Sequence, residues 1–554
     1  MVANLYGIFK PITLSVALAT LLSCGQNNDT LSSVSDLNPG PDSNIKIAGL
    51  AKEINAKDVN TVKILPNTLV PKGLMVYLIG SGPSSSFNNW KFITELYESI
   101  HNINVNSGLQ PTVGLATVGE AELKNQEITL VVMHSKGEGS YYNKFVTHVD
   151  KYMANKYPNF DGRLRLAPME TIERNSWDLW IQDFGEFAMA SVDGVADDVY
   201  MVVDTNRNEN RGVFSPEVFQ KLFGIPLVHL GSNVDNSAQY GGNIEATPEG
   251  VFYMGDSVDD PSYSADGKTS PLFDIIKSKG NPDGKKLSSN WLAVGHVDEY
   301  MTYIPSNQTC SSTLVWGSPL LALKMMLEQA SDQEFKFFSD EFAELYVGYD
   351  PNDQDVYVDV HLTRQQIKAA LDSFAKAPSA IVSSNIADYD LSKAPKLFAE
   401  LEKGVNLGYK DMMKLIRDPK SIASFYVWRN LVDQKNILAS VETVQKDRAC
   451  QQSVEIPQAM LPNFAVDANY GYGIWYKDSA HLPGMTNALV LRDSAIMGDP
   501  WVQTMRDYVK KEVGLHLGGA EKIQFVDDLV YHYALGEVHC ATNVIREKNM
   551  QFTF

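Results

Sequence analysis

The feature that most restricts the fold class lies early in the chain, where two expected strands flank an expected helix. Residues 127–133 and 164–168 have the composition of short buried strands. Between them, residues 142–157 place apolar side chains at helical spacing, at Phe145, Val146, Val149 and Met153. A strand, a helix and a strand in this order form an α/β unit. Because similar patterns recur along the chain, we predict a fold of the α/β class.

The later part of the chain continues this pattern with more helix. Residues 320–455 are predicted to be mostly helical. Helices are expected over residues 90–100, 320–330, 364–377, 398–403, 409–417, 423–441 and 501–513. A last strand is expected over residues 523–531, and it leads to a polar turn that contains Cys540.

Length and charge exclude some functions. The chain has 554 residues, of which 44% are apolar, so it can bury a large core. Its net charge of -20 argues against non-specific binding to nucleic acid. The same charge permits a cationic substrate or a metal ion as partner, and composition does not choose between them.

The N-terminal residues have the features of an export signal. Lys10 precedes an apolar run over residues 12–22 that is too short to span a bilayer comfortably. The sequence Leu-Leu-Ser-Cys at residues 21–24 is typical of a bacterial lipobox. We therefore expect a signal peptide over residues 1–23 and a lipid on Cys24. An ordinary secretory signal or a short anchor is the alternative.

A lipid on Cys24 would place the protein in the bacterial cell envelope. The polar, turn-rich residues after Cys24 suit a flexible tether, expected over residues 24–60. Gly25 stands where an aspartate would favour retention in the inner membrane, so the outer membrane or cell surface is favoured. The lipid is the only membrane contact that we expect.

The other three cysteines have different expected roles. An odd number of cysteines in an exported protein suggests that one stays outside any disulfide. Cys310 and Cys450 could form a disulfide or could both be buried thiols. Cys540 is expected to remain a thiol, and a lone cysteine is usually a buried small hydrophobic residue.

Two segments carry acidic or titratable residues inside apolar sequence. Residues 177–190 look like a core strand but contain Asp183 and Glu186, and buried carboxylates are costly unless they bind something. A strand-end turn with solvated acids is the alternative. In the strand expected over residues 291–304, His296 and Asp298 would share one face.

Cys540, His296, Asp183 and Asp298 together suggest covalent chemistry on a cation. A thiolate is a strong nucleophile, and a histidine transfers protons near neutral pH. A Cys/His pair alone suggests a protease or a transferase. Aspartates would raise the pKa of the thiol unless the substrate cancels their charge. A guanidinium is permanently positive and pairs with carboxylates in bidentate geometry.

Three segments resemble signature motifs of the calcium-dependent protein-arginine deiminases. These are residues 180–183 (WIQD), 295–299 (GHVDE) and 536–543 (GEVHCATN). Further segments match the family in the same order, at residues 66–69, 210–212, 242–245, 289–296, 456–458 and 485–489. The resemblance implies a catalytic domain over residues 61–554, with insertions at about 85–125 and 325–420. It also implies the pentein fold, a five-bladed pseudo-symmetric α/β propeller, here with helical insertions.

The family resemblance implies hydrolysis of arginine residues in peptides or proteins to citrulline and ammonia. Cys540 would attack the guanidinium carbon, and Asp183 and Asp298 would hold the guanidinium. His296 would protonate the departing ammonia and then activate water. Arg211 matches the residue that contacts the substrate backbone, and Trp180 would line the channel that holds the arginine stem.

The resemblance also implies a calcium ion beside the catalytic residues. Gln182, Glu186 and Glu245 match side-chain ligands, and backbone carbonyls near Gly241 and Ile244 would complete the site. Oxygen ligands that include carboxylates suit this hard cation.

Three other functions stay open. The first is deimination of a free guanidine such as arginine or agmatine, for which Arg211 is the discriminating residue. The second is a surface binding lipoprotein whose catalytic site is vestigial. The third, weaker alternative is a cysteine protease.

Overall fold

The computed structural model describes most of the chain from Glu53 to Arg546. The described ranges are 53–79, 88–109, 127–134, 139–158, 160, 166–170, 179–205, 225–230, 239–256, 271–340, 345–349, 355–358, 360–377, 380–402, 409–446, 448–467 and 473–546. The chain divides into two compact units. The first unit comprises Met1–Phe252, Thr269–Gly284 and Val526–Phe554, and the second comprises Tyr253–Lys268 and Lys285–Phe525.

One sheet of the first unit has five strands in the order β1-β8-β7-β6-β2. Their bounds are β1 Glu53–Ile54, β2 Val59–Ile64, β6 Gly185–Val192, β7 Val199–Asp204 and β8 Leu227–His229. β6 begins at Gly185, opposite Asp204 of β7. A Cβ at Gly185 would lie 2.5 Å from a methyl carbon of Val202, so the close approach of these strands requires glycine there.

The folded part of the first unit begins earlier than the sequence predicts. β1 and the 3-10 helix η1 (Ala56–Asp58) both lie within the expected tether of residues 24–60. β1 pairs in parallel with β8, where Glu53 lies opposite Leu227. The tether must therefore end before Glu53.

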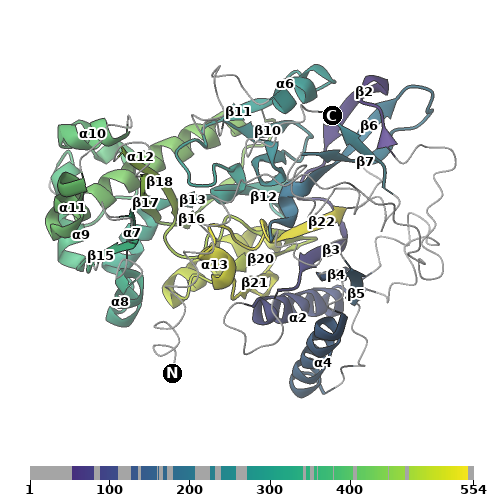
Figure 1. Cartoon of the computed structure of the whole chain (residues 1–554), viewed down its shortest axis with the longest axis horizontal. Helices are drawn as coiled ribbons and strands as arrows, with labels where there is room; N and C mark the ends of the chain where they lie inside the picture. Colours follow the sequence, from purple (N-terminus) through teal and green to yellow (C-terminus); the bar gives the residue numbers. More distant parts are fainter. Residues whose placement is uncertain are drawn as a thin grey trace. The chain divides into compact units, whose positions relative to one another are not determined.

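The second sheet of the first unit confirms the predicted α/β unit. Its order is β22-β3-β4-β5, with bounds β3 Pro71–Tyr77, β4 Thr129–His134, β5 Leu166–Glu170 and β22 Thr542–Arg546. β3, β4 and β5 are parallel, and β22 is antiparallel to β3. Helices α2 (Trp90–Asn106) and α4 (Gly139–Lys156) lie beside these strands (Figure 1).

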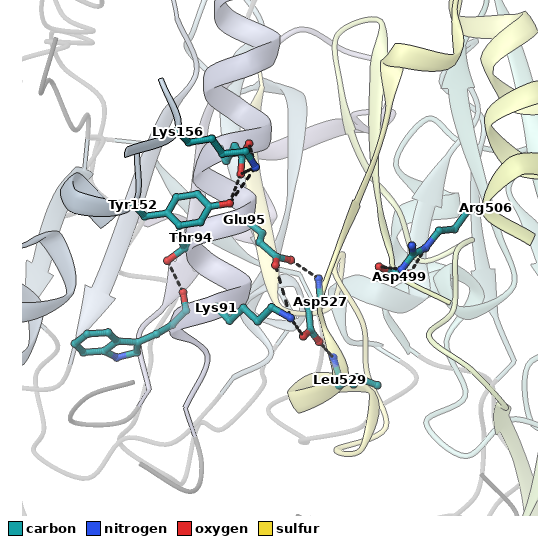
Figure 2. A network of polar contacts seen from close by, with 11 residues as sticks. Lys91, Thr94, Glu95, Tyr152, Lys156, Asp499, Arg506, Asp527 and Leu529 are labelled. Atoms are coloured by element: carbon teal, nitrogen blue, oxygen red, sulfur yellow. Dashed lines mark hydrogen bonds and ion pairs between the residues drawn. The ribbon is translucent and has the colours of Figure 1, made fainter. Parts of the chain in front are cut away.

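Helix α2 connects to the segment before Cys540 through polar contacts. Lys91 forms ion pairs with Glu95 and Asp527, and the backbone N–H of Asp527 donates to Glu95 at 2.7 Å (Figure 2). The Leu529 N–H donates in turn to Asp527 Oδ1 at 3.3 Å. These contacts hold the chain where it leaves β21 (Ile523–Val526).

The strand predicted over residues 523–531 is wrong in its second half. β21 ends at Val526, and residues Leu529–His532 form the short helix α14. The N–H groups of Tyr531 and His532 both donate to the Asp528 carbonyl, at 2.8 and 2.9 Å. This helical turn replaces strand hydrogen bonds and brings the side chains of Asp528 and His532 toward the residues that follow.

A buried acidic pair lies behind the Cys540 turn. Asp528 is fully buried, and its carboxylate oxygens accept no hydrogen bond from the described residues. Burial, and next the neighbouring Glu537 carboxylate, raises the pKa of Asp528 well above its ordinary range, although His532 acts in the opposite direction. Glu537 Oε1 lies 2.7 Å from His532 Nδ1. Burial therefore favours the neutral form of Asp528 beside the Glu537–His532 pair.

The second unit is built from small sheets and a group of helices. Its strands are β10 Phe252–Gly255, which it shares with the first unit, β11 Lys285–Leu287, β12 Met301–Pro305, β13 Ser312–Ser318, β14 Leu345–Tyr349, β15 Asp355–Val358, β16 Ser453–Pro457, β17 Met460–Asp467, β18 Gly473–Ala480, β19 Leu489–Leu491 and β20 Ser494–Gly498. β12-β13-β16 and β19-β20-β21 form three-stranded sheets.

The predicted helices of the second unit are confirmed, with small changes at their ends. They are α7 Pro319–Glu328, α9 Arg364–Phe374, α10 Lys396–Glu402, α11 Tyr409–Arg417, α12 Pro419–Gln445 and α13 Gln503–Leu517, and α8 Asp332–Asp340 was not predicted. Most of them gather at one end of the unit, at the left of Figure 1. No helix in the described ranges is long and apolar enough to cross a membrane.

A disulfide joins Cys310 to Cys450 and resolves the alternative left open by the sequence. The two cysteines are 140 positions apart, so the bond closes a loop that contains α7 to α12. Closing a long loop restricts the unfolded chain and stabilises the folded state. Cys540 is buried and takes no part in this bond.

The α/β class is confirmed by both units. The described strands form several separate sheets. The five-bladed pentein propeller stays a prediction.

We predict that Asp528→Asn stabilises the protein at neutral pH. Asp528 has a higher pKa in the folded state than in the unfolded state. Its carboxyl therefore contributes stability below about pH 4, and this contribution is lost as the pH rises through the folded-state pKa. Each pKa unit of that rise corresponds to about 1.4 kcal/mol. The amide copies the neutral acid, so thermal unfolding should depend less on pH above 4.

Asp527→Asn is the matched control for this change. It removes the charge that pairs with Lys91 and should lower stability slightly, by about 0–1 kcal/mol, without flattening the pH dependence. An unchanged pH slope in Asp528→Asn would contradict the neutral assignment.

Candidate active site

Cys540 lies in a tight turn between α14 and β22. The Ala541 N–H donates to the Glu537 carbonyl at 3.0 Å, and the Thr542 N–H donates to the His539 carbonyl at 3.0 Å. The Thr542 hydroxyl adds a bond to the Val538 carbonyl at 2.9 Å. These local bonds give the turn a defined shape, and they place a buried cysteine at the start of a strand.

The predicted acidic segment contacts this turn directly. Residues Ile181–Phe184 form the 3-10 helix η2, and the Gln182 N–H donates to the Cys540 carbonyl at 3.4 Å. Asp183 is buried, and its Oδ1 accepts from the Gly242 N–H at 3.2 Å. Gln182, the neighbour of Asp183, therefore contacts Cys540 although the two segments are far apart in sequence.

The strand predicted over residues 177–190 is wrong in its first described part. The Asp183 N–H donates to the Trp180 carbonyl at 3.1 Å, which closes a 3-10 turn, and β6 begins only at Gly185. Asn543 holds this turn from β22, because its side-chain amide donates to the carbonyls of Ile181 and Gly185, at 3.3 and 3.1 Å. The turn depends on this long-range contact, which strand periodicity does not reveal.

Trp180 packs against the Cys540 segment. A Cβ at Gly536 would lie 2.2 Å from a ring carbon of Trp180, so only glycine leaves room for the indole. The Trp180 ring also lies 6.0 Å from the ring of Tyr531, whose hydroxyl accepts from Asn89 at 2.5 Å. Trp180 is half-buried, and its role in a substrate channel stays a prediction.

The five predicted calcium-binding residues lie in the first unit, and Gln182, Glu186 and Gly241 are in direct contact. Gln182 Nε2 donates to Glu186 Oε1 at 2.5 Å. A Cβ at Gly241 would lie 2.0 Å from the Gln182 carbonyl oxygen and 2.9 Å from Glu186 Oε1. Gly241 begins the 3-10 helix η4 (Gly241–Asn243), which leads directly into β9 (Ile244–Ala246) and thus to Glu245.

The cluster around Gln182 and Glu186 is rich in oxygen atoms. Within the described ranges, no group of three His, Cys, Asp or Glu side chains is arranged to hold a metal ion. The cluster instead offers the buried carboxylates of Glu186 and Glu245, one amide and backbone carbonyls. His539 Nε2 lies 3.9 Å from Glu245 Oε1, which connects the cluster to the Cys540 turn.

His296 and Asp298 lie in the second unit, in a turn and not in a strand. Residues Val297–Glu299 form the 3-10 helix η5, and β12 begins only at Met301. The Glu299 carboxylate accepts from the N–H groups of Gly295 and His296, at 3.0 and 2.9 Å. Gly295 has a φ of 87°, which also interrupts an extended strand. The strand predicted over residues 291–304 is therefore wrong before Met301.

The His296 turn is held by two polar side chains of the second unit. Both His296 and Asp298 are buried. The Glu299 carbonyl accepts from Gln458 Nε2 at 2.7 Å and from the Thr486 hydroxyl at 2.8 Å. Gln458 belongs to one of the segments that match the deiminase motifs, and this contact gives that match a structural role.

The predicted site residues are therefore distributed over both units. The first unit contains Trp180, Gln182, Asp183, Glu186, Gly241, Ile244, Glu245 and Cys540. The second contains His296 and Asp298. Arg211 and Cys24 lie outside the described residues.

The sequence did not indicate several residues that hold the site. Asn67 donates to both carboxylate oxygens of Glu245, at 2.9 and 2.7 Å. Arg546 contacts Asn67 in turn, and Glu537 with His532 supports the Cys540 turn from behind. Asn67 and Glu537 lie inside segments that match the family motifs, and that match is the sequence feature that could have indicated them. Their spacing does not show which residues they contact.

Comparison with known sequences identifies relatives that match less than a third of the chain. Protein-arginine deiminase type-1 of Mus musculus is 24% identical over 172 residues, which cover 28% of this chain and 25% of that protein. Protein-arginine deiminase type-4 of Homo sapiens is 25% identical over 174 residues, which cover 29% of this chain and 25% of that protein. The chain thus spans about a quarter of the length of these curated relatives.

Solved structures with a similar chain path include two agmatine deiminases. The enzyme from C. jejuni is 12% identical with a TM-score of 0.39, and the alignment covers 89% of this chain and 98% of that chain. The enzyme from Enterococcus faecalis is 10% identical with a TM-score of 0.37, over 89% of this chain and 98% of that chain.

The family assignment rests on a match over most of the sequence. The family model described as "Protein-arginine deiminase (PAD)" matches residues 121–552. This range contains Asp183, His296, Asp298 and Cys540. The chain belongs to the protein-arginine deiminase family.

Proposed function

We propose that the protein hydrolyses the guanidino group of arginine residues in peptides or proteins, giving citrulline and ammonia. Family membership supports the reaction class. The observation that supports the proposal is the hydrogen bond from the Gln182 N–H to the Cys540 carbonyl, which joins the segment that contains the buried Asp183 to the buried cysteine. Such an environment disfavours a free thiolate and favours a bound cation.

Cys540 is the proposed nucleophile. Its sulfur forms a bond to the guanidinium carbon, one C–N bond breaks, and the nitrogen leaves as ammonia after taking up a proton. Water then attacks the same carbon, the C–S bond breaks, and the thiol is restored with citrulline as product. The sum is one arginine side chain and one water converted to citrulline and ammonia.

Asp183 and Asp298 are the proposed carboxylate partners of the guanidinium. A guanidinium presents N–H donors in a planar fork, and each carboxylate can accept two of them. The buried state of both aspartates strengthens this attraction, because little water screens it. A neutral or anionic substrate would leave these charges uncompensated, which explains selectivity for a cation.

His296 is the proposed proton-transfer residue. It would give a proton to the departing nitrogen and then take one from the attacking water, as one imidazole can do near neutral pH. The Glu299 contacts fix the backbone on which His296 stands. Assembly of His296 and Asp298 with Cys540 on one guanidinium is part of this proposal.

A calcium ion is the proposed cofactor, and the residues in the first unit fit it. The Gln182 carbonyl and Glu186 Oε1 converge on the space that a Cβ at Gly241 would fill. Glu245 supplies a second buried carboxylate, so the donor set contains only oxygens, as calcium prefers. When bound, the ion would neutralise these carboxylates and order η2 and η4 beside Cys540.

We also propose a lipid-anchored location in a bacterial cell envelope. The lipobox at residues 21–24, with Cys24 as the lipid-bearing residue, carries this proposal. The disulfide between Cys310 and Cys450 supports it, because such bonds persist mainly in oxidising compartments. The proposed membrane contact is the lipid alone.

Citrulline release from a blocked arginine ester tests the reaction and its nucleophile. Cys540→Ala should lower the rate by at least about 1,000-fold, because the covalent route is lost. Thermal unfolding of both proteins controls for folding. Mass spectrometry of an arginine peptide should show a gain of about one mass unit. Release that does not depend on Cys540, or peptide cleavage, would overturn the proposal.

The substrate class is tested by Arg211→Ala. Loss of a charged contact to the peptide backbone should lower kcat/KM for a blocked arginine peptide about 10- to 100-fold and leave agmatine turnover unchanged. Arg207→Ala, in the same polar loop, is the matched control. If the native enzyme turned over agmatine far better than the peptide, a small-molecule deiminase would replace this proposal.

Calcium binding is tested by calorimetry and by thermal unfolding with and without a chelator. Calcium at about 100 times its Kd should stabilise the native protein by about 2.7 kcal/mol, and Glu186→Gln and Glu245→Gln should remove most of this effect. Asp198→Asn, an exposed change in the same unit, should retain it. Equal activity and equal Tm in calcium and in chelator would remove the metal from the proposal.

A further inference from the structure

Arg546 is a buried cation at the end of β22. Only 5% of its surface is exposed. Nη1 donates to the carbonyls of Asn67 and Leu69, at 2.7 and 3.0 Å, and Nη2 donates to Asn67 Oδ1 at 2.9 Å. Burying a charge is costly unless opposite charge lies nearby. Arg546 therefore needs an anionic neighbour.

The anionic neighbours of Arg546 are the two carboxylates of the candidate calcium site. Burial lowers the pKa of Arg546 to about 10, while Glu245, Glu186 and Tyr200 oppose that change. The guanidinium is thus still protonated at neutral pH. Glu186, Glu245 and the guanidinium together carry a single net negative charge.

Asn67 connects the cation to one of the carboxylates. Its Nδ2 donates to both oxygens of Glu245, and its Oδ1 faces Arg546. Only this orientation of the amide is possible, because a guanidinium offers only donors and a carboxylate only acceptors. The three side chains therefore form an ordered line from Arg546 through Asn67 to Glu245.

We propose that Arg546 is a built-in counter-ion of the calcium site, and that Asn67 positions Glu245 for the metal. This inference rests on the proposed calcium site. Arg546 stabilises the acidic cluster while no metal is bound. When a divalent ion binds, its charge replaces part of that stabilisation. The guanidinium also repels the ion. Arg546 and Asn67 together allow the site to fold without a metal ion, and they limit its affinity for calcium.

The charge of Arg546 is tested by a matched pair of variants, Arg546→Gln and Arg546→Lys. Both alter the hydrogen bonds, but only the lysine keeps the charge. In chelator, Arg546→Gln should unfold several degrees below Arg546→Lys. In millimolar calcium this gap should largely close, because the metal replaces the missing charge. A purely structural role would give the same gap in both conditions and would overturn the proposal.

The positioning role is tested by Asn67→Leu with calorimetric titration of calcium. Loss of a residue that orients a ligand typically weakens metal binding about 10- to 100-fold. Asn60→Leu is the control, because Asn60 also donates to a carboxylate, Asp193, but at the surface. Calcium affinity equal to that of the native protein in Asn67→Leu would overturn this part.

These outcomes are distinguishable from failure of the calcium proposal itself. If the native protein binds no calcium in calorimetry, the cofactor proposal fails, and the positioning role fails with it. The counter-ion role fails as well, because no metal would be there to replace the missing charge. If the native protein does bind calcium, an equal gap between Arg546→Gln and Arg546→Lys in chelator and in calcium overturns the counter-ion role alone.

Discussion

Buried negative charge is the constraint on which the first unit depends. Asp183, Glu186 and Glu245 are all withdrawn from water, and each must be compensated by donors or by a cation. The Gly242 N–H serves Asp183, and the Asn67 amide serves Glu245. Arg546 supplies positive charge from β22, the same strand that follows Cys540. Cys540 and the charge compensation of the acidic cluster are thus joined through one short piece of chain, so a change in one is expected to affect the other.

The second unit also compensates buried charge, next to the segment that leads into the His296 turn. Asp478 receives hydrogen bonds from buried Arg429, which also binds Asp433 on the same helix, α12. The backbone of Asp478 exchanges hydrogen bonds with Trp291 and Ala293, at 3.0 and 2.8 Å. A buried ion cluster therefore anchors the segment that leads into the His296 turn. Breaking one member of such a cluster is costly, because it leaves an uncompensated charge in the core. The segment before the His296 turn is thus held by charge pairing as well as by apolar packing.

The errors of the sequence predictions have a common cause. Three predicted strands, over residues 177–190, 291–304 and 523–531, are each interrupted by a short helical turn. The turns are stabilised by contacts such as the Asn543 amide on Ile181, or the Glu299 carboxylate on Gly295, together with a positive φ at a glycine. Apolar periodicity is a local property and does not report them. The long helices were predicted well because their spacing of apolar residues is sustained over several turns.

The sequence alone determined the α/β class, most helices, the family and the residue types of the proposed chemistry. These follow from local periodicity and from short motifs whose order along the chain is specific. Only the tertiary structure decided which residues hold the acidic cluster, because Asn67, Glu245 and Arg546 are far apart in sequence and meet through strand pairing and loop contacts. It also decided that Cys310 and Cys450 are bonded and that Asp528 is buried beside Glu537, which raises its pKa. Charge compensation in a core depends on distance in space, and one-dimensional spacing does not contain that quantity.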